Sequence, residues 1–300
     1  MTAWCARRRR CTKAFSESGF RRPLGLFLQG GGALGAWQAG ALEALVAAGA
    51  GFDSIMGYSI GVINGAALAF GRLPEALERW RRLDGRALKL KPRLKPFALC
   101  SPDALREFFD FERDEARAKA AIKIDFTVVT ACLAEGAALN ARFSPGGGLW
   151  DGPFVEHAAA SCAIPLVFPP VEVHYRGRRV RLLDGGVPVG APLDFSPLAR
   201  CPDVLVLEMV RADEMGRREM LPWRAIDQGA REAGRRLVDR GLKTLLEGDA
   251  APPRVFRLAP SRRLVPMMLD FRSPGLKEML ALGAEDAAAL LADSSRFRVL

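Results

Sequence analysis

A serine between two glycines is the first feature of this sequence that could perform chemistry. Residues 57–61 read Gly-Tyr-Ser-Ile-Gly and follow a short apolar run. Gly-x-Ser-x-Gly between a strand and a helix is typical of a nucleophile elbow, a sharp turn that lifts the serine hydroxyl out of the sheet. Glycines suit such a turn because a Cβ there would collide with the neighbouring strand or helix. Since so short a motif recurs by chance, Ser59 needs support from the rest of the chain.

The hydroxyl of Ser59 needs a base, and the sequence offers few candidates. Only His157 and His174 are present, and a serine–acid–histidine order would require an acid such as Asp151. We expect both histidines to be ordinary packing or surface residues. Asp184 closes a predicted strand and is followed by two glycines, which leave space around its carboxylate. A carboxylate bonded directly to a serine can take its proton where water is excluded.

A glycine-rich loop precedes the serine and has two interpretations. Residues 30–35 (Gly30-x-Gly32-x-x-Gly35) fit a dinucleotide fingerprint, which also needs an acid at the end of the second strand. That strand ends at the elbow here, and Asp53 stands at its beginning. Exposed backbone N–H groups and a helix N-terminus suit an oxyanion instead. We therefore predict an oxyanion hole formed by Gly30, Gly31, Gly32 and Ile60.

Alternating strands and helices must position these groups. A strand over 24–29, a helix over 36–48 and the elbow predict an α/β fold with a largely parallel sheet. Further strands are predicted at 123–132, 137–143, 171–175, 178–183, 203–210 and 253–258, and further helices at 101–121, 153–162, 222–247 and 276–291. The apolar spacing of 222–247, which includes Ile226 and Leu237, predicts an amphipathic helix.

Composition excludes several classes of protein. Apolar residues make up 49% of the 300, and the mean hydropathy is +0.05, which suits a sizeable core. No run of eighteen apolar residues predicts a transmembrane helix, and no apolar region follows the first arginines as in a secretion signal. Six widely spaced cysteines predict mostly buried free thiols in a reducing compartment. With two histidines and no paired ligands, we expect no metal and no cofactor.

The net charge of +10 is unevenly distributed. Residues 1–23 hold seven basic side chains against one acid, and we interpret them as a solvated arm rather than a ligand for anionic lipid or nucleic acid. Residues 72–97 hold nine basic residues interleaved with apolar ones. They have two interpretations, a solvated helix and loop, or a mobile segment that meets a membrane surface.

Four segments in this order resemble the patatin-like phospholipase family. They are Gly30–Ala36, Gly57–Gly61, Ala160–Pro165 and Asp184–Gly186, within a resemblance that covers Leu24 to Leu193. The resemblance implies a three-layer α/β/α domain, a Ser59–Asp184 dyad and hydrolysis of lipid acyl esters. It also implies that the motif glycines matter, namely Gly35, Gly57, Gly61, Gly185 and Gly186.

Two residues depart from the family pattern. Leu34 stands where Arg or Lys is commonest, so we expect an altered preference for head group or phosphate. Tyr58 stands where a small residue is common, so we expect a narrower pocket beside Ser59. The segment Asp270–Arg272 resembles a C-terminal extension of some bacterial members, and we assign it no chemistry.

We therefore expect a cytoplasmic lipid acyl hydrolase. Its chain divides into a disordered tail at 1–22, a catalytic domain at 23–215 and a helical extension at 216–300 packed on the same domain. The expected partners are a lipid ester substrate and, transiently, a membrane surface, but no nucleic acid. The alternatives are a lipid acyltransferase, a nucleotide-binding oxidoreductase, and a non-catalytic lipid-binding or regulatory protein.

Overall fold

A mixed sheet with a parallel centre forms the middle of the molecule. The computed structural model describes residues 15–83, 90–94, 97–101, 103–107, 109, 113–248, 251–272 and 274–299. Within them the sheet has the strand order β11-β10-β9-β1-β2-β5-β8-β7, with β6 also paired to β5. The strands are β1 (Leu24–Leu28), β2 (Ser54–Gly57), β5 (Asp125–Cys132), β6 (Ala137–Phe143), β7 (Val171–Tyr175), β8 (Arg178–Asp184), β9 (Asp203–Leu207), β10 (Arg254–Leu258) and β11 (Arg298–Val299).

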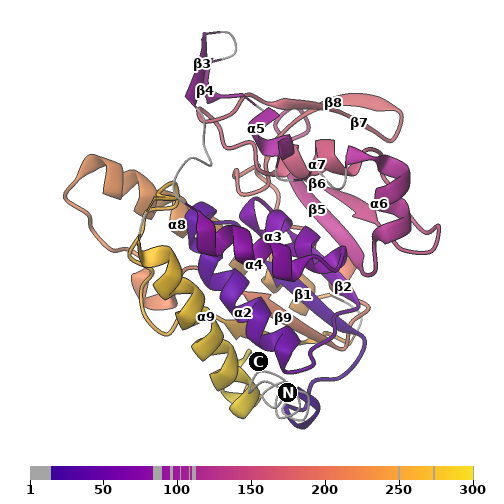
Figure 1. The fold of residues 1–300 in the computed structure, drawn as a ribbon, viewed down its shortest axis with the longest axis vertical. Helices are drawn as coiled ribbons and strands as arrows, with labels where there is room; N and C mark the ends of the chain where they lie inside the picture. Colours follow the sequence, from indigo (N-terminus) through magenta and orange to yellow (C-terminus); the bar gives the residue numbers. More distant parts are fainter. Residues whose placement is uncertain are drawn as a thin grey trace.

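Helices cover both faces of this sheet, as the α/β prediction requires (Figure 1). Strands β10, β9, β1, β2 and β5 are parallel, and β1 alternates its apolar side chains between two cores. Leu26 and Leu28 face the core beneath α2, α3 and α9, whereas Phe27 faces the core beneath α8. The longer helices are α2 (Gly35–Ala47), α3 (Ile60–Ala69), α4 (Leu73–Arg82), α7 (Phe154–Ser161), α8 (Pro222–Leu246) and α9 (Gly275–Ala292). The three-layer α/β/α prediction is confirmed.

The hairpin β7–β8 brings a distant part of the chain to the end of β2. Strand β5 pairs with β6 along one edge, so its pairings with β2 and β8 lie on the other edge. Strand β2 occupies that edge up to Val128, and β8 follows it at Thr130, the partner of Asp184. Consequently Asp184 lies next to the C-terminal end of β2, where the elbow begins.

The segment after the elbow helix is less regular than predicted. Instead of one helix over 101–121, the described residues form α5 (Asp103–Arg106) and α6 (Glu115–Ala121). Helix α6 begins where the Asp114 carboxylate accepts hydrogen bonds from the amides of Ala116 and Arg117, a typical N-cap. The remaining short elements are the hairpin β3 (Leu90–Leu94) and β4 (Phe97–Cys100), and the 3-10 turns η1 (Gly32–Leu34), η3 (Ser196–Leu198), η4 (Ala212–Glu214) and η5 (Ser294–Phe297).

Both described ends of the chain pack against the central sheet or its helices. Residues 15–22, expected in a disordered tail, pack against the sheet through Phe20, whose ring lies 4.6 Å from that of Phe256. Arg21 pairs with the buried Asp203. Residues 1–14 lie outside the described residues. At the other end, residues 216–300 were predicted as a helical extension packed on the catalytic domain. They contain α8 and α9, which packs on α2, and also the strands β10 and β11, which extend the main sheet.

The basic stretch at 72–97 is only partly described. Helix α4 buries Leu73, Leu77 and Trp80 and exposes most of its charged residues, which fits the solvated-helix interpretation for this part. Residues 84–89 and 95–96 lie outside the described residues. Among the helices that the structure describes, none combines the length and the apolar character needed to span a membrane.

Candidate active site

The predicted elbow is present at Ser59. This residue has a φ of 54° and a ψ of −130°, an unfavourable conformation for a residue with a side chain. The neighbouring glycines permit the turn, since a Cβ on Gly61 would lie 2.2 Å from the carbonyl oxygen of Leu28. A Cβ on Gly35 would lie 2.4 Å from Ile60. Strand β1 and helix α2 therefore press directly against the turn that presents the serine.

Ser161, at the C-terminus of α7, joins the elbow to the aspartate. The amide of Ser59 donates to both the carbonyl oxygen and the hydroxyl of Ser161, each at 3.0 Å. The same carbonyl accepts from the amide of Gly185 at 3.4 Å, and the Ser161 hydroxyl donates to the carbonyl of Val129 at 2.6 Å. Through one buried residue, the nucleophile turn, strand β5 and the Asp184 loop are held together.

The carboxyl group of Asp184 is buried behind Ser59. The amide of Gly186 donates to its Oδ1 at 2.8 Å, whereas Oδ2 has no hydrogen-bond partner of good geometry among the described residues. Burial raises the pKa of Asp184 to about 6, against the opposing effects of the nearby Ser59 hydroxyl and the Gly186 amide. The structure thus brings the two predicted catalytic residues together and leaves Oδ2 as the oxygen available to the serine.

The glycine loop lies beside Ser59, with three uncommitted backbone amides near it. Among the hydrogen bonds of the described residues, none uses the amide of Gly31, Gly32 or Ile60. The amide of Ala33 is unavailable, because it donates to the carbonyl of Met268 at 2.7 Å. Gly32 has a φ of +56°, and a Cβ there would lie 2.0 Å from the same Met268 oxygen, so only glycine fits.

The side chain of Tyr58 does not narrow the pocket, contrary to the prediction. It is buried in the core on the α8 side of the sheet, and burial raises its pKa. Three motif glycines accommodate its ring, because a Cβ on Gly30, Gly185 or Gly186 would lie within 2.9 Å of Tyr58. These glycines therefore serve packing around Tyr58 as well as the site. A Cβ on Gly30 would also lie 2.7 Å from Cβ of Ser59, so this glycine lies directly beside the serine.

Leu34 likewise lies away from the chemistry. Its side chain is fully buried in the core beneath α2 and does not line the pocket that contains Ser59. The effect expected on head-group preference would have to come from other residues.

Neither histidine is placed to act as a base. His157 is buried among the rings of Phe143 and Tyr175, and burial lowers its pKa to about 4. His174 is an exposed residue of β7. Neither lines the pocket with Ser59, as expected for packing and surface residues. The described cysteines, Cys100, Cys132, Cys162 and Cys201, are buried and unpaired, as predicted, while Cys5 and Cys11 lie outside the described residues.

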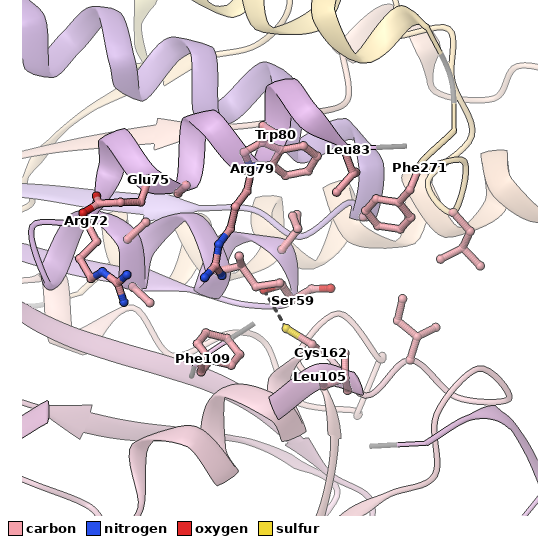
Figure 2. A pocket seen from close by; sticks show the side chains of 18 of the residues that line it. Ser59, Arg72, Glu75, Arg79, Trp80, Leu83, Leu105, Phe109, Cys162 and Phe271 are labelled. Carbon is pink, nitrogen blue, oxygen red and sulfur yellow. Dashed lines mark hydrogen bonds between the residues drawn. The ribbon is translucent and has the colours of Figure 1, made fainter. Parts of the chain in front are cut away.

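A mainly apolar pocket of about 120 Å³ opens at Ser59. Helices α3 and α4 form one wall, and the small side chains of Ala66 and Ala67 leave room along α3. The other residues of this wall are Ile63 of α3, Ala76 and Trp80 of α4, and Leu83 just after α4. The opposite wall comprises Leu105, Phe109, Cys162, Ile164 and Phe168. Figure 2 shows Ser59 between these walls, with Arg72 and Glu75 at one end and Phe271 at the other. Such a slot fits an alkyl chain better than a polar ligand.

Several residues of the site were missed by sequence reasoning. Leu269 and Phe271 line the pocket although their segment was assigned no chemistry, and Met268 holds the glycine loop. Ser161 was noted only as part of a motif. The signal for it was its place five residues after an acid and just before a Pro-rich stretch, which does not reveal a hydrogen bond to residue 59. Within the described residues, no cluster of three or more histidine, cysteine or acidic side chains could hold a metal ion.

Curated proteins give no match. Among solved structures, VipD from Legionella pneumophila is similar at 12% identity with a TM-score of 0.45, over 91% of this chain and 67% of that one. The type III effector protein ExoU is similar at 14% identity with a TM-score of 0.40, over 91% of this chain and 53% of that one, so this chain spans about half its length.

The family comparison covers the elbow, Ser161, the Asp184 loop and the glycine loop. The model of the family described as patatin-like phospholipase matches residues 26–194, more than half of the chain. This range begins in β1 and ends after the Asp184 loop, so it contains each catalytic residue predicted from the sequence. The protein therefore belongs to the patatin-like phospholipase family.

Proposed function

We propose that this protein is a serine lipid acyl hydrolase that uses Ser59 and Asp184 as a catalytic dyad. Family membership supports lipid hydrolysis. The observation that carries the finer proposal is the buried Asp184 carboxyl, which interacts with the side chain of the strained Ser59. Its Oδ2 lacks a partner of good geometry among the described residues.

In the proposed reaction, the Oγ of Ser59 attacks the ester carbonyl carbon while its proton passes to Oδ2 of Asp184. The amides of Gly31, Gly32 and Ile60 hold the resulting oxyanion. Asp184 then returns the proton to the leaving alcohol oxygen, and the acyl group stays on Ser59. Water then attacks this ester while one of its protons passes to Asp184. As the bond between the acyl carbon and Oγ breaks, Asp184 returns that proton to Oγ of Ser59, and the fatty acid leaves. A carboxylate whose pKa is about 6 is a better base than an ordinary aspartate and is still mostly ionised at neutral pH.

The apolar pocket supports a fatty acyl substrate. The acyl chain would lie along the face of α3 where Ala66 and Ala67 leave space, opposite Phe109. Burying a chain of methylenes there contributes roughly 0.8 kcal/mol for each CH₂. Such a pocket therefore favours long apolar chains over short ones, with the ester at Ser59.

A covalent probe and matched variants test the dyad. A fluorophosphonate should label Ser59, and both Ser59→Ala and Asp184→Asn should lose ester turnover by at least about a thousandfold. Cys162→Ala tests the other nucleophile in the pocket. Burial keeps the pKa of this thiol, which donates to the Ser59 carbonyl, far above its ordinary value, so the probe should still label the variant. Full turnover by Ser59→Ala or Asp184→Asn would refute the dyad. Absence of labelling in the folded wild type would favour a non-catalytic lipid-binding protein.

The same assay separates hydrolysis from transfer. With an added alcohol or lysolipid acceptor, a hydrolase releases free fatty acid, whereas a transferase forms a new ester. We expect free fatty acid to dominate.

A further inference from the structure

An apolar surface lies outside the catalytic pocket, around the beginning of α8. Helix α8 was expected to bury Ile226, but this side chain is 75% exposed, and Trp223 is 55% exposed. Met220 and Leu221 precede them and are also exposed, as are Val265 and Leu269 in the loop before α9. Exposed large apolar residues scattered singly are ordinary, but six within two short segments are not.

These two segments form one surface. Arg231 of α8 is buried and donates to the carbonyl oxygens of Leu264 and Pro266, at 3.0 and 2.5 Å. Asp227 accepts from the Arg231 guanidinium and from the amide of Met268, both at 2.7 Å. This ion pair fixes the loop against α8, and Figure 1 shows the beginning of α8 beside the chain that leads to α9. We call residues 217–226 and 262–269 the docking surface.

The unpaired charges of the docking surface are positive. Arg218, Arg224 and Arg262 are exposed and make no ion pair with any described residue. The nearby acids are neutralised within the protein, since Glu219 pairs with Arg217 and Arg263, and Asp227 pairs with Arg231. Unpaired cations around exposed tryptophan and aliphatic side chains match the chemistry of an anionic lipid surface.

The docking surface continues into the catalytic pocket. Leu269 belongs to both, and Phe271 lines the pocket two residues later. One residue before Leu269, the carbonyl of Met268 accepts from Ala33 in the glycine loop. A membrane in contact with this surface would therefore lie at the entrance through which a lipid reaches Ser59.

We propose that residues 217–226 and 262–269 dock this protein on anionic membranes and orient the pocket toward the bilayer. The role of this binding, delivery of lipid to the pocket, rests on the proposed function, but the binding itself needs no catalysis. A second copy of the chain fits less well, because two such surfaces would oppose unpaired arginines. Trp223 suits the boundary between head groups and acyl chains, where tryptophan is enriched.

Vesicle sedimentation tests this proposal with the full chain carrying Ser59→Ala, so that the lipid stays intact. Vesicles of phosphatidylcholine with phosphatidylserine should bind the protein, and vesicles of phosphatidylcholine alone should bind it far less. The pair Trp223→Ser and Ile226→Ser should weaken binding by at least about tenfold. Arg224→Glu should weaken it by about fivefold or more and reduce its dependence on salt. All these side chains are exposed, so the fold should survive.

Matched controls on other faces make the result specific. Leu133→Ser changes an equally exposed residue after β5, and Arg240→Glu reverses an exposed charge on α8 away from the docking surface. Neither should change vesicle binding. With Ser59 restored, the docking variants should hydrolyse a soluble short-chain ester at the wild-type rate and lose only vesicle turnover.

The possible outcomes separate this proposal from the dyad. Vesicle binding that the docking variants leave unchanged, or that the controls reduce equally, would overturn the docking surface. A change in oligomeric state with vesicle binding intact would assign the surface to a second copy instead. Loss of soluble-ester turnover by Ser59→Ala beside unaltered vesicle binding by the docking variants would sustain the dyad and reject the docking surface.

Discussion

At the scale of single residues, burial sets how Asp184 can act. Its pKa of about 6 is raised because the carboxyl lies behind Ser59 out of contact with water. Only the ionised form can take the serine proton. Below pH 6 the ionised fraction falls about tenfold for each pH unit, so kcat/KM should fall with it. A pH–rate profile on a soluble ester, with His157→Phe as the control, checks this.

The control separates the two possible bases. His157 is buried and its pKa is lowered to about 4, so its removal should leave the inflection near pH 6 unchanged. An inflection that disappears in His157→Phe would assign the titration to the histidine and contradict the dyad.

The same burial predicts that Asp184 costs stability. Its pKa is about 6 when folded against 3.8 in the reference state, so the folded chain prefers the protonated carboxyl. At a pH between 3.8 and about 6, the carboxyl of Asp184 has lost its proton in the unfolded chain but retains it in the folded chain. The free energy of unfolding therefore falls as pH rises through this window, by up to about 3 kcal/mol.

Asp184→Asn should remove this cost together with the activity. At pH 7.5 the inactive variant should be more stable than the wild type, and the difference should shrink toward pH 4. Denaturant unfolding at both pH values measures it. Equal stability of the two proteins at pH 7.5 would show that the carboxyl is not held in the unfavourable environment described.

At the scale of elements, the C-terminus of α7 positions the nucleophile. Ser161→Ala removes the hydroxyl that accepts from the Ser59 amide and donates to Val129. Because the elbow loses one of its fixed contacts, kcat should fall by about ten- to a hundredfold with little change in KM. Steady-state kinetics on a soluble ester measures this.

Ser54→Ala is the matched control for Ser161→Ala. Ser54 is a buried serine on β2, and its hydroxyl contacts only the carbonyl of Pro197, away from the elbow. Both variants should lose a similar amount of stability, about 1 kcal/mol. If Ser161→Ala retains the wild-type kcat, or Ser54→Ala loses as much, then Ser161 is merely structural.

At the scale of the whole molecule, the last helix closes the fold against the first. Helices α2 and α9 approach closely because Gly283 faces α2, and a Cβ there would lie 1.9 Å from the carbonyl of Trp37. The Trp37 indole donates to Asp286 of α9 at 2.8 Å. Gly283→Ala should therefore lower the free energy of unfolding by about 3 kcal/mol or more.

Gly229→Ala should have the opposite effect on the free energy of unfolding. This glycine lies in α8 with open space where the Cβ would stand, so alanine should stabilise the protein by up to about 1 kcal/mol. Thermal and denaturant unfolding of both variants measures the difference. A Gly283→Ala protein as stable as the wild type would show that α9 is not an integral part of the catalytic domain.

The regular elements could be predicted from the sequence, as could the proximity of Ser59 and Asp184, the proposed catalytic pair. Apolar runs such as Leu24–Leu28 are buried on both faces. The turn at Gly57–Gly61 leaves no space for a Cβ at Gly61, so the glycines themselves indicate the turn. Asp184 was predicted as the base on chemical grounds, since the two histidines had no suitable context. The strand at 253–258 was predicted but its partner was not, because the pairing between β9 and β10 is a long-range contact that periodicity does not reveal.

By itself, the sequence determined the α/β alternation, the elbow serine and the choice of an aspartate over a histidine, because each depends on neighbours within a few residues. Only the tertiary structure decided where Tyr58 points, that Ser161 bonds the elbow, and that Leu269 and Phe271 reach the pocket. Those contacts join residues far apart in the chain, and β-strand order and helix packing, rather than local preference, bring them together.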